Sequence, residues 1–272
     1  QEKSVPMFET LTPAKPDPIL TIMAAFREDK RSDKIDLSVG VYKDEGGGTP
    51  IVSALREAEL RLHAQQQTKT YLGPLGDVGF NDLMRDLVFG AGADKARIRT
   101  AQTPGGCGAL RLLADLVAAA RPDATVHIPD PTWVNHEPLL TSSGLKLKNY
   151  SYFDRAGGGV RFESMVRDLA VAKRGDVVLL HGCCHNPTGA DLDMAQWRTI
   201  GTLMLDRGLF PMIDLAYQGL GFGLEEDAEP VRHLASIMPE MAVAASCSKN
   251  FAVYRDRVGA AFILASSAPA AD

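Results

Sequence analysis

The chain has 272 residues, of which 45% are hydrophobic and 23% charged, a composition typical of a globular protein with one large domain or slightly more. Its 29 Lys and Arg are outnumbered by 34 Asp and Glu, giving a net charge of −5, which argues against a nucleic-acid surface. The sequence has neither an uninterrupted run of roughly 18 apolar residues nor a basic and apolar N-terminal signal, so we expect no membrane partner.

The cysteines also bear on the cellular compartment. They do not form a disulfide framework, because Cys183 and Cys184 are adjacent and would close only a strained bridge. Reduced thiols and the lack of a signal together predict a cytoplasmic protein.

The first hundred residues give few regular patterns. A short helix is expected from Ile19 to Arg27 within a Pro-rich arm. Residues 53–67 place alanines and leucines at helical spacing with charges on the other face, which predicts an amphipathic helix. Residues 71–80, YLGPLGDVGF, are typical of a Gly-rich turn region.

After about residue 100, apolar runs alternate with helical stretches. Helices are predicted at 108–122, ended by Pro122, and at 195–208, ended by Gly208. Strands, each given with the residues that directly follow it, are predicted at 125–133, 175–189, 209–219, 240–250 and 258–266. This alternation predicts an α/β fold whose largely parallel sheet is covered by helices on both faces.

Polar residues follow several of these apolar runs. Asn186, Asp214 and Lys249 each stand at the end of a predicted strand, and Gly105 to Gly108 open a predicted helix. Ligands of such sheets bind at the carboxyl ends of strands and at helix N-termini. We therefore expect these groups to converge on one side of the sheet.

The combination of residue types indicates a cofactor. A lysine forms a Schiff base with an aldehyde, and an aspartate keeps a pyridinium nitrogen protonated. A phosphate is bound by helix-end amides and an arginine. Pyridoxal phosphate requires all of these groups.

Longer motifs carry a resemblance to a known family. The segments QTPGGCGAL, HGCCHNPTG, DLAYQG and SCSKNFAVYRDRVGA, together with the earlier LSVGVYKDE and TYLGPLG, resemble the class I (fold-type I) pyridoxal-phosphate aminotransferases of the aspartate and aromatic amino-acid group. The resemblance covers nearly the whole chain. It implies a mostly parallel seven-stranded sheet in a three-layer α/β/α domain, with part of a small domain.

The resemblance implies three catalytic residues. Lys249 would form the Schiff base and, once substrate displaces it, move the proton between the substrate Cα and the cofactor. Asp214 would pair with the pyridine N1–H and keep the ring cationic. Tyr217 and Asn186 would hydrogen-bond the phenolic oxygen of the ring.

It also implies the residues that hold the cofactor phosphate. Arg257 and Ser246 would bind it together with the amides of Gly106 and Cys107. Many relatives have a hydroxyl residue at the position of Cys107, so one phosphate hydrogen bond is expected to be weaker here.

The remaining implied contacts involve the ring, the substrate and a second subunit. Trp133 would stack on the ring and, with Asn186 and Gly40, contact the substrate. Tyr71 would reach the phosphate of the neighbouring subunit, because members of the family are homodimers with sites built across the interface.

Each residue also has a plainer interpretation. Lys249 and Arg257 could be ordinary surface charges, and Asp214 a capping residue. The run from His181 to His185, with Cys183 and Cys184, imitates a metal cluster, but its spacing suits no tetrahedral site, so we expect no metal. His127 and His136 look like packing or surface residues with no assigned role.

Members of the family are longer than this chain, and their last third supplies two substrate-binding arginines. On the resemblance, residues 1–45 would be the arm and the start of the small domain, and 46–272 the large cofactor-binding domain. The expected reaction is ping-pong transfer of an amino group from an aromatic amino acid or aspartate to a 2-oxo acid such as 2-oxoglutarate. The alternatives are a truncated cofactor-binding remnant without turnover and a different pyridoxal-phosphate reaction, such as β-elimination or decarboxylation.

Overall fold

The computed structural model describes residues 7–11, 18–36, 38 and 40–272. The chain divides into two compact units, residues 1–50 and 51–272, and each is described by itself. In the first unit, helix α1 (Pro18–Glu28) confirms the helix predicted for residues 19–27. Residues 1–6 and 12–17 of the predicted arm lie outside the described residues.

The second unit contains a seven-stranded sheet and eight α-helices in its described length. The strands are β1 (Ile98–Pro104), β2 (Thr125–Asp130), β3 (Lys146–Ser151), β4 (Val177–His181), β5 (Phe210–Leu215), β6 (Met241–Ser246) and β7 (Val258–Leu264). The helices are α2 (Ser53–Gln65), α3 (Val78–Phe89), α4 (Gly105–Ala120), α5 (His136–Thr141), α6 (Phe162–Ala170), α7 (Met194–Arg207), α8 (Glu229–Ile237) and α9 (Ala268–Ala271).

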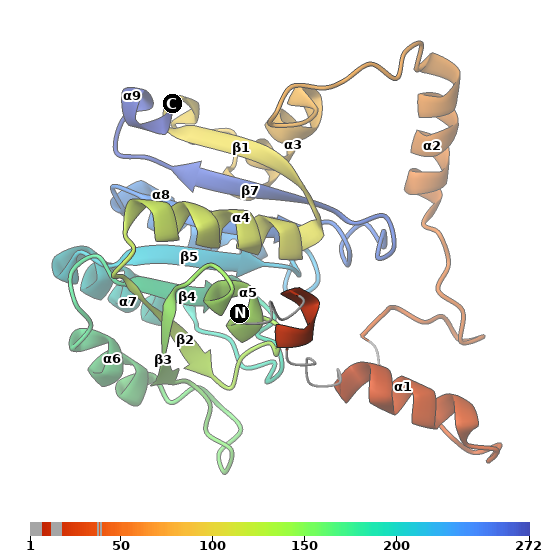
Figure 1. Ribbon diagram of the computed structural model, residues 1–272, viewed down its shortest axis with the longest axis horizontal. Helices are drawn as coiled ribbons and strands as arrows, with labels where there is room; N and C mark the ends of the chain where they lie inside the picture. The colour runs from red at the N-terminus through yellow and green to blue at the C-terminus, as the bar shows by residue number, and fades with distance from the viewer. Residues whose placement is uncertain (1–6, 12–17, 37, 39) are drawn as a thin grey trace, which may run out of the picture. The chain divides into compact units, whose positions relative to one another are not determined.

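The sheet is mostly parallel, as predicted. Its strand order is β1-β7-β6-β5-β4-β2-β3 (Figure 1). The pairs from β6 to β3 are all parallel, whereas β7 runs antiparallel to both of its neighbours. The parallel strands are joined through helical crossovers, and the β6–β7 connection needs none because the two strands are antiparallel.

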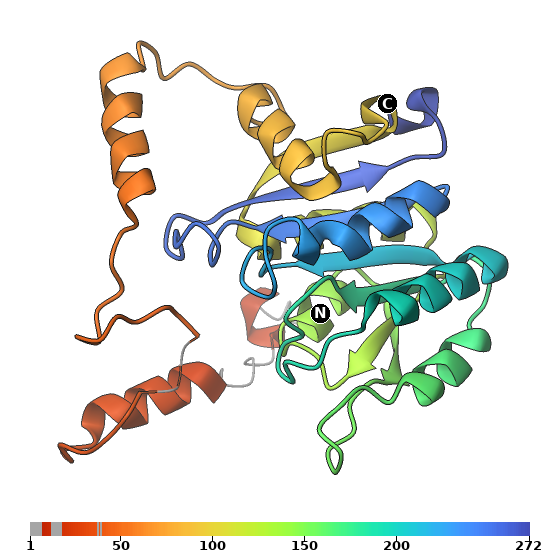
Figure 2. The same ribbon diagram turned by 180° about the vertical axis from the view of Figure 1, so that it is seen from behind.

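Helices cover both faces of this sheet, which confirms the predicted three-layer arrangement. Helices α4 and α5 lie on one face, in front of the strands in Figure 1, and α3, α6, α7 and α8 lie on the other, nearest the viewer in Figure 2. Side chains of each central strand alternate between the two cores. In β6, Val243 packs with the larger helical layer and Ala242 and Ala244 pack against the α4 side.

The start of α4 lies directly against the carboxyl end of the sheet. A Cβ added to Gly259 in β7 would be 2.6 Å from both the Ala245 carbonyl oxygen and the Gly105 carbonyl carbon. Only a glycine allows the backbones of β6, β7 and α4 to approach this closely. The helix N-terminus is therefore fixed beside the end of β6.

One local prediction is confirmed and another needs correction. The run from Gly105 to Gly108 opens helix α4 as predicted and forms its first turn. The segment 71–80 is not a turn throughout, because Asp77 accepts a hydrogen bond from the Phe80 amide at 2.8 Å and caps α3 from Val78 onward.

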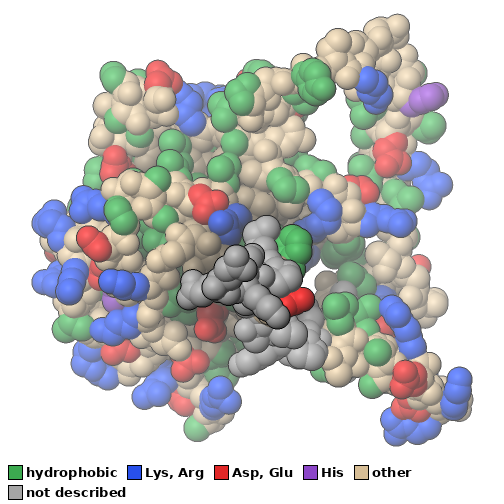
Figure 3. Space-filling view, in the orientation of Figure 1, with side chains coloured by type: hydrophobic (Ala, Val, Ile, Leu, Met, Phe, Trp, Pro, Cys, Tyr) green, Lys and Arg blue, Asp and Glu red, His purple; other side chains and the backbone are tan. Residues whose placement is uncertain are grey.

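The described surface is mixed in charge. On the face drawn in Figure 3, Lys and Arg side chains lie interspersed with Asp and Glu side chains. Among the residues that the structure describes, no helix has the length and apolar character needed to cross a bilayer.

Candidate functional site

Three polar residues that were predicted at strand ends lie together at the carboxyl ends of β4, β5 and β6. Asp214 lies within β5 and is paired in register with His181 of β4 and Ala244 of β6. Lys249 follows β6 by three residues, and its Nζ lies 4.9 Å from the centroid of the Tyr217 ring. Asn186 donates from Nδ2 to the Tyr217 hydroxyl at 3.4 Å. The structure thus brings these predicted residues together.

Asp214 is a buried carboxylate held in its charged form. Burial alone would raise its pKa, but the hydrogen bond from His136 Nε2 to Oδ2 (2.9 Å) and the positive charge of Lys249 hold the pKa below its usual value. In the part of the chain that the structure describes, no donor is bonded to Asp214 Oδ1. This oxygen can accept a hydrogen bond from a ligand N–H.

A directed chain of hydrogen bonds supports Asp214. Burial lowers the pKa of His181 to about 3, so its ring is neutral, and its Nδ1 accepts from the Asn186 amide at 3.3 Å. Its proton is therefore on Nε2, which lies 3.2 Å from Thr132 Oγ1. The Thr132 hydroxyl then donates to His136 Nδ1 at 2.7 Å, leaving His136 Nε2–H to donate to Asp214.

Sequence reasoning missed His136. It gave this residue no role, yet its side chain is fully buried and bonded to the carboxylate of a predicted site residue. The two partners are 78 positions apart in sequence, so no local spacing indicates the bond. His127, also given no role, is bonded to Asp176 at 3.0 Å and pairs with Lys148 and Val178 on the neighbouring strands.

Lys249 has the environment of a nucleophilic amine. Burial is the main cause that lowers its pKa, with a smaller contribution from Arg257, while the nearby Asp214 and Cys107 oppose the shift. More of its amine is therefore unprotonated at neutral pH than in an exposed lysine. Tyr217 keeps its proton, because burial raises the pKa of its phenol.

The first turn of α4 forms a cradle for an anion. No side chain caps this 16-residue helix, so its first amides are free to bind a ligand. Arg257 lies beside it, with Nη2 3.8 Å from Cys107 Sγ and Nη1 3.2 Å from Ser248 Oγ. The backbone of Arg257 is held at φ 57, a conformation that is costly for a non-glycine residue and is found at functional sites.

The donor set fits pyridoxal phosphate. The free oxygen of the ionised Asp214 suits a pyridinium N–H, the uncapped α4 amides and Arg257 suit a phosphate, and the Lys249 amine suits an aldehyde. Asp214 and Lys249 lie at the carboxyl ends of the adjacent strands β5 and β6, and α4 begins directly after the carboxyl end of β1.

Three more residues were predicted to contact the cofactor or the substrate, and they do not all lie at this site. Trp133 packs edge-on against His136, with ring centroids 5.3 Å apart, and so lies next to the site. Tyr71 follows α2 with its side chain fully exposed. Gly40 belongs to the first unit, and a Cβ there would meet nothing within 4 Å.

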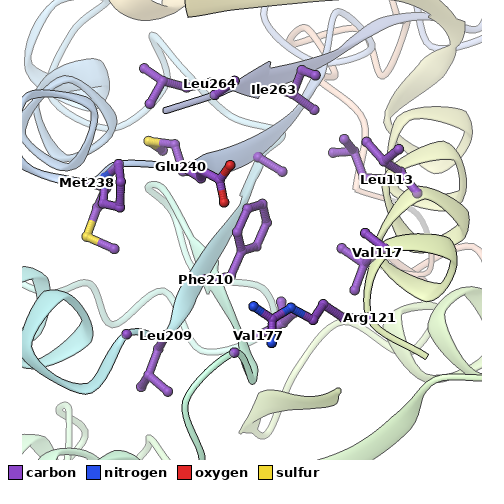
Figure 4. Close-up of a pocket in the computed structure, with 18 of the residues that line it drawn as sticks. Leu113, Val117, Arg121, Val177, Leu209, Phe210, Met238, Glu240, Ile263 and Leu264 are labelled. Carbon is purple, nitrogen blue, oxygen red and sulfur yellow. The ribbon is translucent and has the colours of Figure 1, made fainter. Parts of the chain in front are cut away.

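A cavity of about 440 Å³ lies at the opposite end of the sheet (Figure 4). It is lined by residues at the starts of β4, β5 and β6, including Val177 and Phe210, and by Leu113 and Val117 of α4. The cavity is therefore remote from Lys249 and Asp214, and none of the predicted site residues lines it.

The cysteines and histidines near residue 183 do not meet as a ligand cluster. Cys183 is buried in the core, and all four cysteines are free thiols. Within the described residues, no group of three or more His, Cys, Asp or Glu side chains has the arrangement of a metal site.

Comparisons with known proteins agree with this geometry. The family model described as aminotransferase class I and II matches residues 32–271. An aromatic-amino-acid aminotransferase of Paracoccus denitrificans is 50% identical over 96% of this chain and 66% of the relative, and an aspartate aminotransferase of Salmonella typhi is 45% identical over 98% and 68%. This chain spans about two thirds of the length of these relatives.

A solved structure shows the same fold. The aromatic-amino-acid aminotransferase of Burkholderia pseudomallei, described as covalently bound to pyridoxal phosphate, has a TM-score of 0.94 and 38% identity over 98% of this chain and 68% of that one. The predicted fold type, cofactor and enzyme class are thereby confirmed at the level of the family. The chain belongs to the class I and II aminotransferase family.

Proposed function

We propose that this chain uses pyridoxal phosphate to transfer an amino group from an aromatic amino acid or aspartate to a 2-oxo acid such as 2-oxoglutarate. The relatives named for aromatic amino acids and for aspartate support both donor classes. The observation that carries the proposal is the pairing of an ionised, buried Asp214 with the partly buried amine of Lys249 at adjacent strand ends.

Lys249, Asp214 and Tyr217 have the catalytic roles in this proposal. When bound, pyridoxal phosphate supplies a ring that takes up the electron pair released at the substrate Cα. Lys249 Nζ holds the cofactor covalently and then, as a free amine, takes the proton from Cα. Asp214 Oδ1 accepts the ring N–H, and its charge keeps that proton in place.

Asn186 and Tyr217 act together at the other side of the ring. Because the Tyr217 oxygen accepts from Asn186, the Tyr217 hydroxyl hydrogen is free to be donated to the phenolic oxygen of the cofactor. The indole of Trp133, which packs against His136 beside the site, would cover one face of the bound ring. In this proposal Trp133, Asn186 and Gly40 also contact the substrate.

The phosphate is bound by Ser246, Arg257 and the amides of Gly106 and Cys107. The uncapped start of α4 and the position of Arg257 beside it support this assignment. Tyr71 contributes from the second subunit of a homodimer, which its exposed side chain permits. Residues 1–45 are then the arm and the start of the small domain, and 46–272 the large domain. Cytoplasmic localisation remains a prediction from the sequence.

Single-turnover product analysis tests this proposal. The chain loaded with pyridoxal phosphate is mixed with phenylalanine, tyrosine or aspartate, and the corresponding 2-oxo acid is measured by mass spectrometry. We expect about one equivalent of product per chain without an acceptor and continued turnover with 2-oxoglutarate, as ping-pong transfer requires. Lys249→Ala should abolish product, whereas Lys148→Ala, at an exposed lysine of β3, should not.

Two other outcomes would change the conclusion. Cofactor binding with no 2-oxo acid from any of the three donors would favour the remnant without turnover. Release of ammonia or carbon dioxide in place of amino transfer would favour elimination or decarboxylation.

A further inference from the structure

The cavity at the amino ends of the central strands has the dimensions of a small-molecule site. Its volume of about 440 Å³ lies within the range of roughly 300–1,000 Å³ that ligand pockets occupy. The sheet forms one wall through the first residues of β4, β5 and β6, and helix α4 forms another. All of the lining residues belong to the second unit, at the end of the sheet away from Lys249.

Most of the lining of this cavity is apolar. Val177 and Phe210 line it from the sheet, and Leu113 and Val117 line it from α4 (Figure 4). Leu116 of the same helix also lines it and is left 48% exposed. Covering apolar surface of this kind is favourable, so the cavity favours a ligand with an apolar body.

Two arginines provide positive charge in one part of the lining. A Cβ added to Gly175 would lie 2.7 Å from Arg121 Nη1, and a Cβ added to Gly208 would lie 2.5 Å from Arg174 Nη1. The two glycines are joined by a hydrogen bond from the Gly175 amide to the Gly208 carbonyl oxygen at 2.8 Å. The two guanidiniums therefore lie against neighbouring points of the backbone.

No carboxylate of the described residues pairs with these two charges. Neither guanidinium has a hydrogen bond or an ion pair within the described ranges. Glu240 also lines the cavity, but Figure 4 shows it on the opposite side of the Phe210 ring from Arg121. Unpaired guanidiniums beside an apolar surface are complementary to a carboxylate, which a guanidinium can bind through two parallel hydrogen bonds.

We propose that this cavity is a binding site for an apolar monocarboxylate. The carboxylate of the ligand lies at Arg121 and Arg174, and its alkyl or aryl body lies along Phe210 and Val117. A second carboxylate would meet only apolar side chains and Glu240 on the far side, so a dicarboxylate is disfavoured. The site is separate from the one for pyridoxal phosphate, and the inference does not depend on the proposed function.

Titration calorimetry of the folded chain with octanoate tests this site. Octanoate should bind, whereas 1-octanol, which has an alkyl chain of the same length without the charge, should bind about tenfold more weakly because it cannot make charge-assisted hydrogen bonds. 3-Phenylpropionate is titrated in parallel, and only the binding that Arg121→Gln removes is counted for each acid. The tighter of the two acids then shows whether the ligand body is alkyl or aryl.

Matched variants locate the binding. Arg121→Gln and Arg174→Gln should each weaken octanoate binding by about tenfold, whereas Arg198→Gln, at an exposed arginine of α7 outside the cavity, should not. A second pair tests the apolar wall. Leu116→Asp should weaken binding by placing a negative charge beside the ligand. Leu112→Asp should bind as the wild type does, because Leu112 is 47% exposed on the same helix but does not line the cavity.

Addition of the cofactor distinguishes this site from the catalytic one. Saturating pyridoxal phosphate should leave the affinity for octanoate unchanged, because the proposed cofactor residues lie at the other end of the sheet. Competition between the two ligands would place octanoate at Lys249 and Arg257 and would overturn the inference.

Three further results would also overturn the inference while leaving the proposed function in place. They are no binding of octanoate at about 10 mM, equal affinities for octanoate and 1-octanol, and wild-type affinity in both Arg121→Gln and Arg174→Gln. Circular dichroism should match that of the wild type in every variant, since each changed side chain is exposed.

Discussion

At the scale of single residues, the site depends on keeping Asp214 charged in a buried position. Its support comes from His136 and, through Thr132, from His181. None of these three was predicted, although Asp214, Asn186 and Lys249 were placed correctly at strand ends. The predicted residues each follow an apolar run, whereas the supporting bonds join strands and helices far apart in sequence.

His136→Phe tests this support. Losing the donor to a buried carboxylate should lower the free energy of unfolding by about 2 kcal/mol and weaken cofactor binding. His127→Phe is the control, because it removes an equally buried His–Asp bond, to Asp176. Urea unfolding should show similar losses in both variants, and only His136→Phe should change the affinity in a pyridoxal phosphate titration. Equal affinities would contradict the account.

The same variant should alter the pH dependence of stability. The pKa of Asp214 is lower in the folded chain than its ordinary 3.8, so its stabilisation is present above that value and is lost as pH falls through the folded pKa. Without His136 the folded pKa rises. Acid unfolding followed by circular dichroism should then begin at a higher pH in His136→Phe than in the wild type; coincident curves would argue against the Asp214 assignment.

Lys249 should titrate differently from an exposed lysine. Because burial lowers its pKa from 10.5, its free amine should be available at a lower pH. The rate of reductive methylation by formaldehyde, resolved by peptide mass spectrometry, should therefore have a lower midpoint for Lys249 than for exposed Lys148. A midpoint at or above 10.5 would remove the argument that burial activates this amine.

At the scale of elements, the central parallel strands were predictable because each is a continuous apolar run between turn signals. The polar residues that follow them could be placed for the same reason. The edge strands β1 and β3 were not predicted from pattern. β3 reads KLKNYS and exposes both of its lysines, because an edge strand packs on fewer neighbours and carries charges. The antiparallel direction of β7 was likewise not evident, since an apolar run does not encode strand direction.

The contact among β6, β7 and α4 gives a prediction at this scale. Gly259→Ala would force a methyl group against the Ala245 and Gly105 backbones, and overpacking of this kind costs about 1–3 kcal/mol. Gly92→Ala is the control, because a Cβ there would meet nothing within 4 Å. Thermal unfolding should show a clear fall in Tm for the first variant only. A Gly259→Ala protein as stable as wild type would mean that α4 can shift away from the sheet.

At the scale of the whole molecule, the proposed homodimer makes each site depend on two chains. Tyr71 would act on the neighbouring subunit, so Tyr71→Ala and Lys249→Ala should complement each other. In a mixed dimer, one site has both residues and the other has neither, so about one cofactor should bind per dimer. Mixing and refolding the two variants should restore high-affinity covalent binding at low pyridoxal phosphate. No gain over the separate variants would show that Tyr71 does not act across subunits.

The most direct test of the central claim is to identify where the cofactor attaches. The folded chain is incubated with pyridoxal phosphate, reduced with borohydride, digested and mapped by mass spectrometry. The account predicts about one reduced adduct per chain, on the peptide that contains Lys249, because its amine is the activated one. A label spread over exposed lysines, or no label on the folded chain, would contradict it.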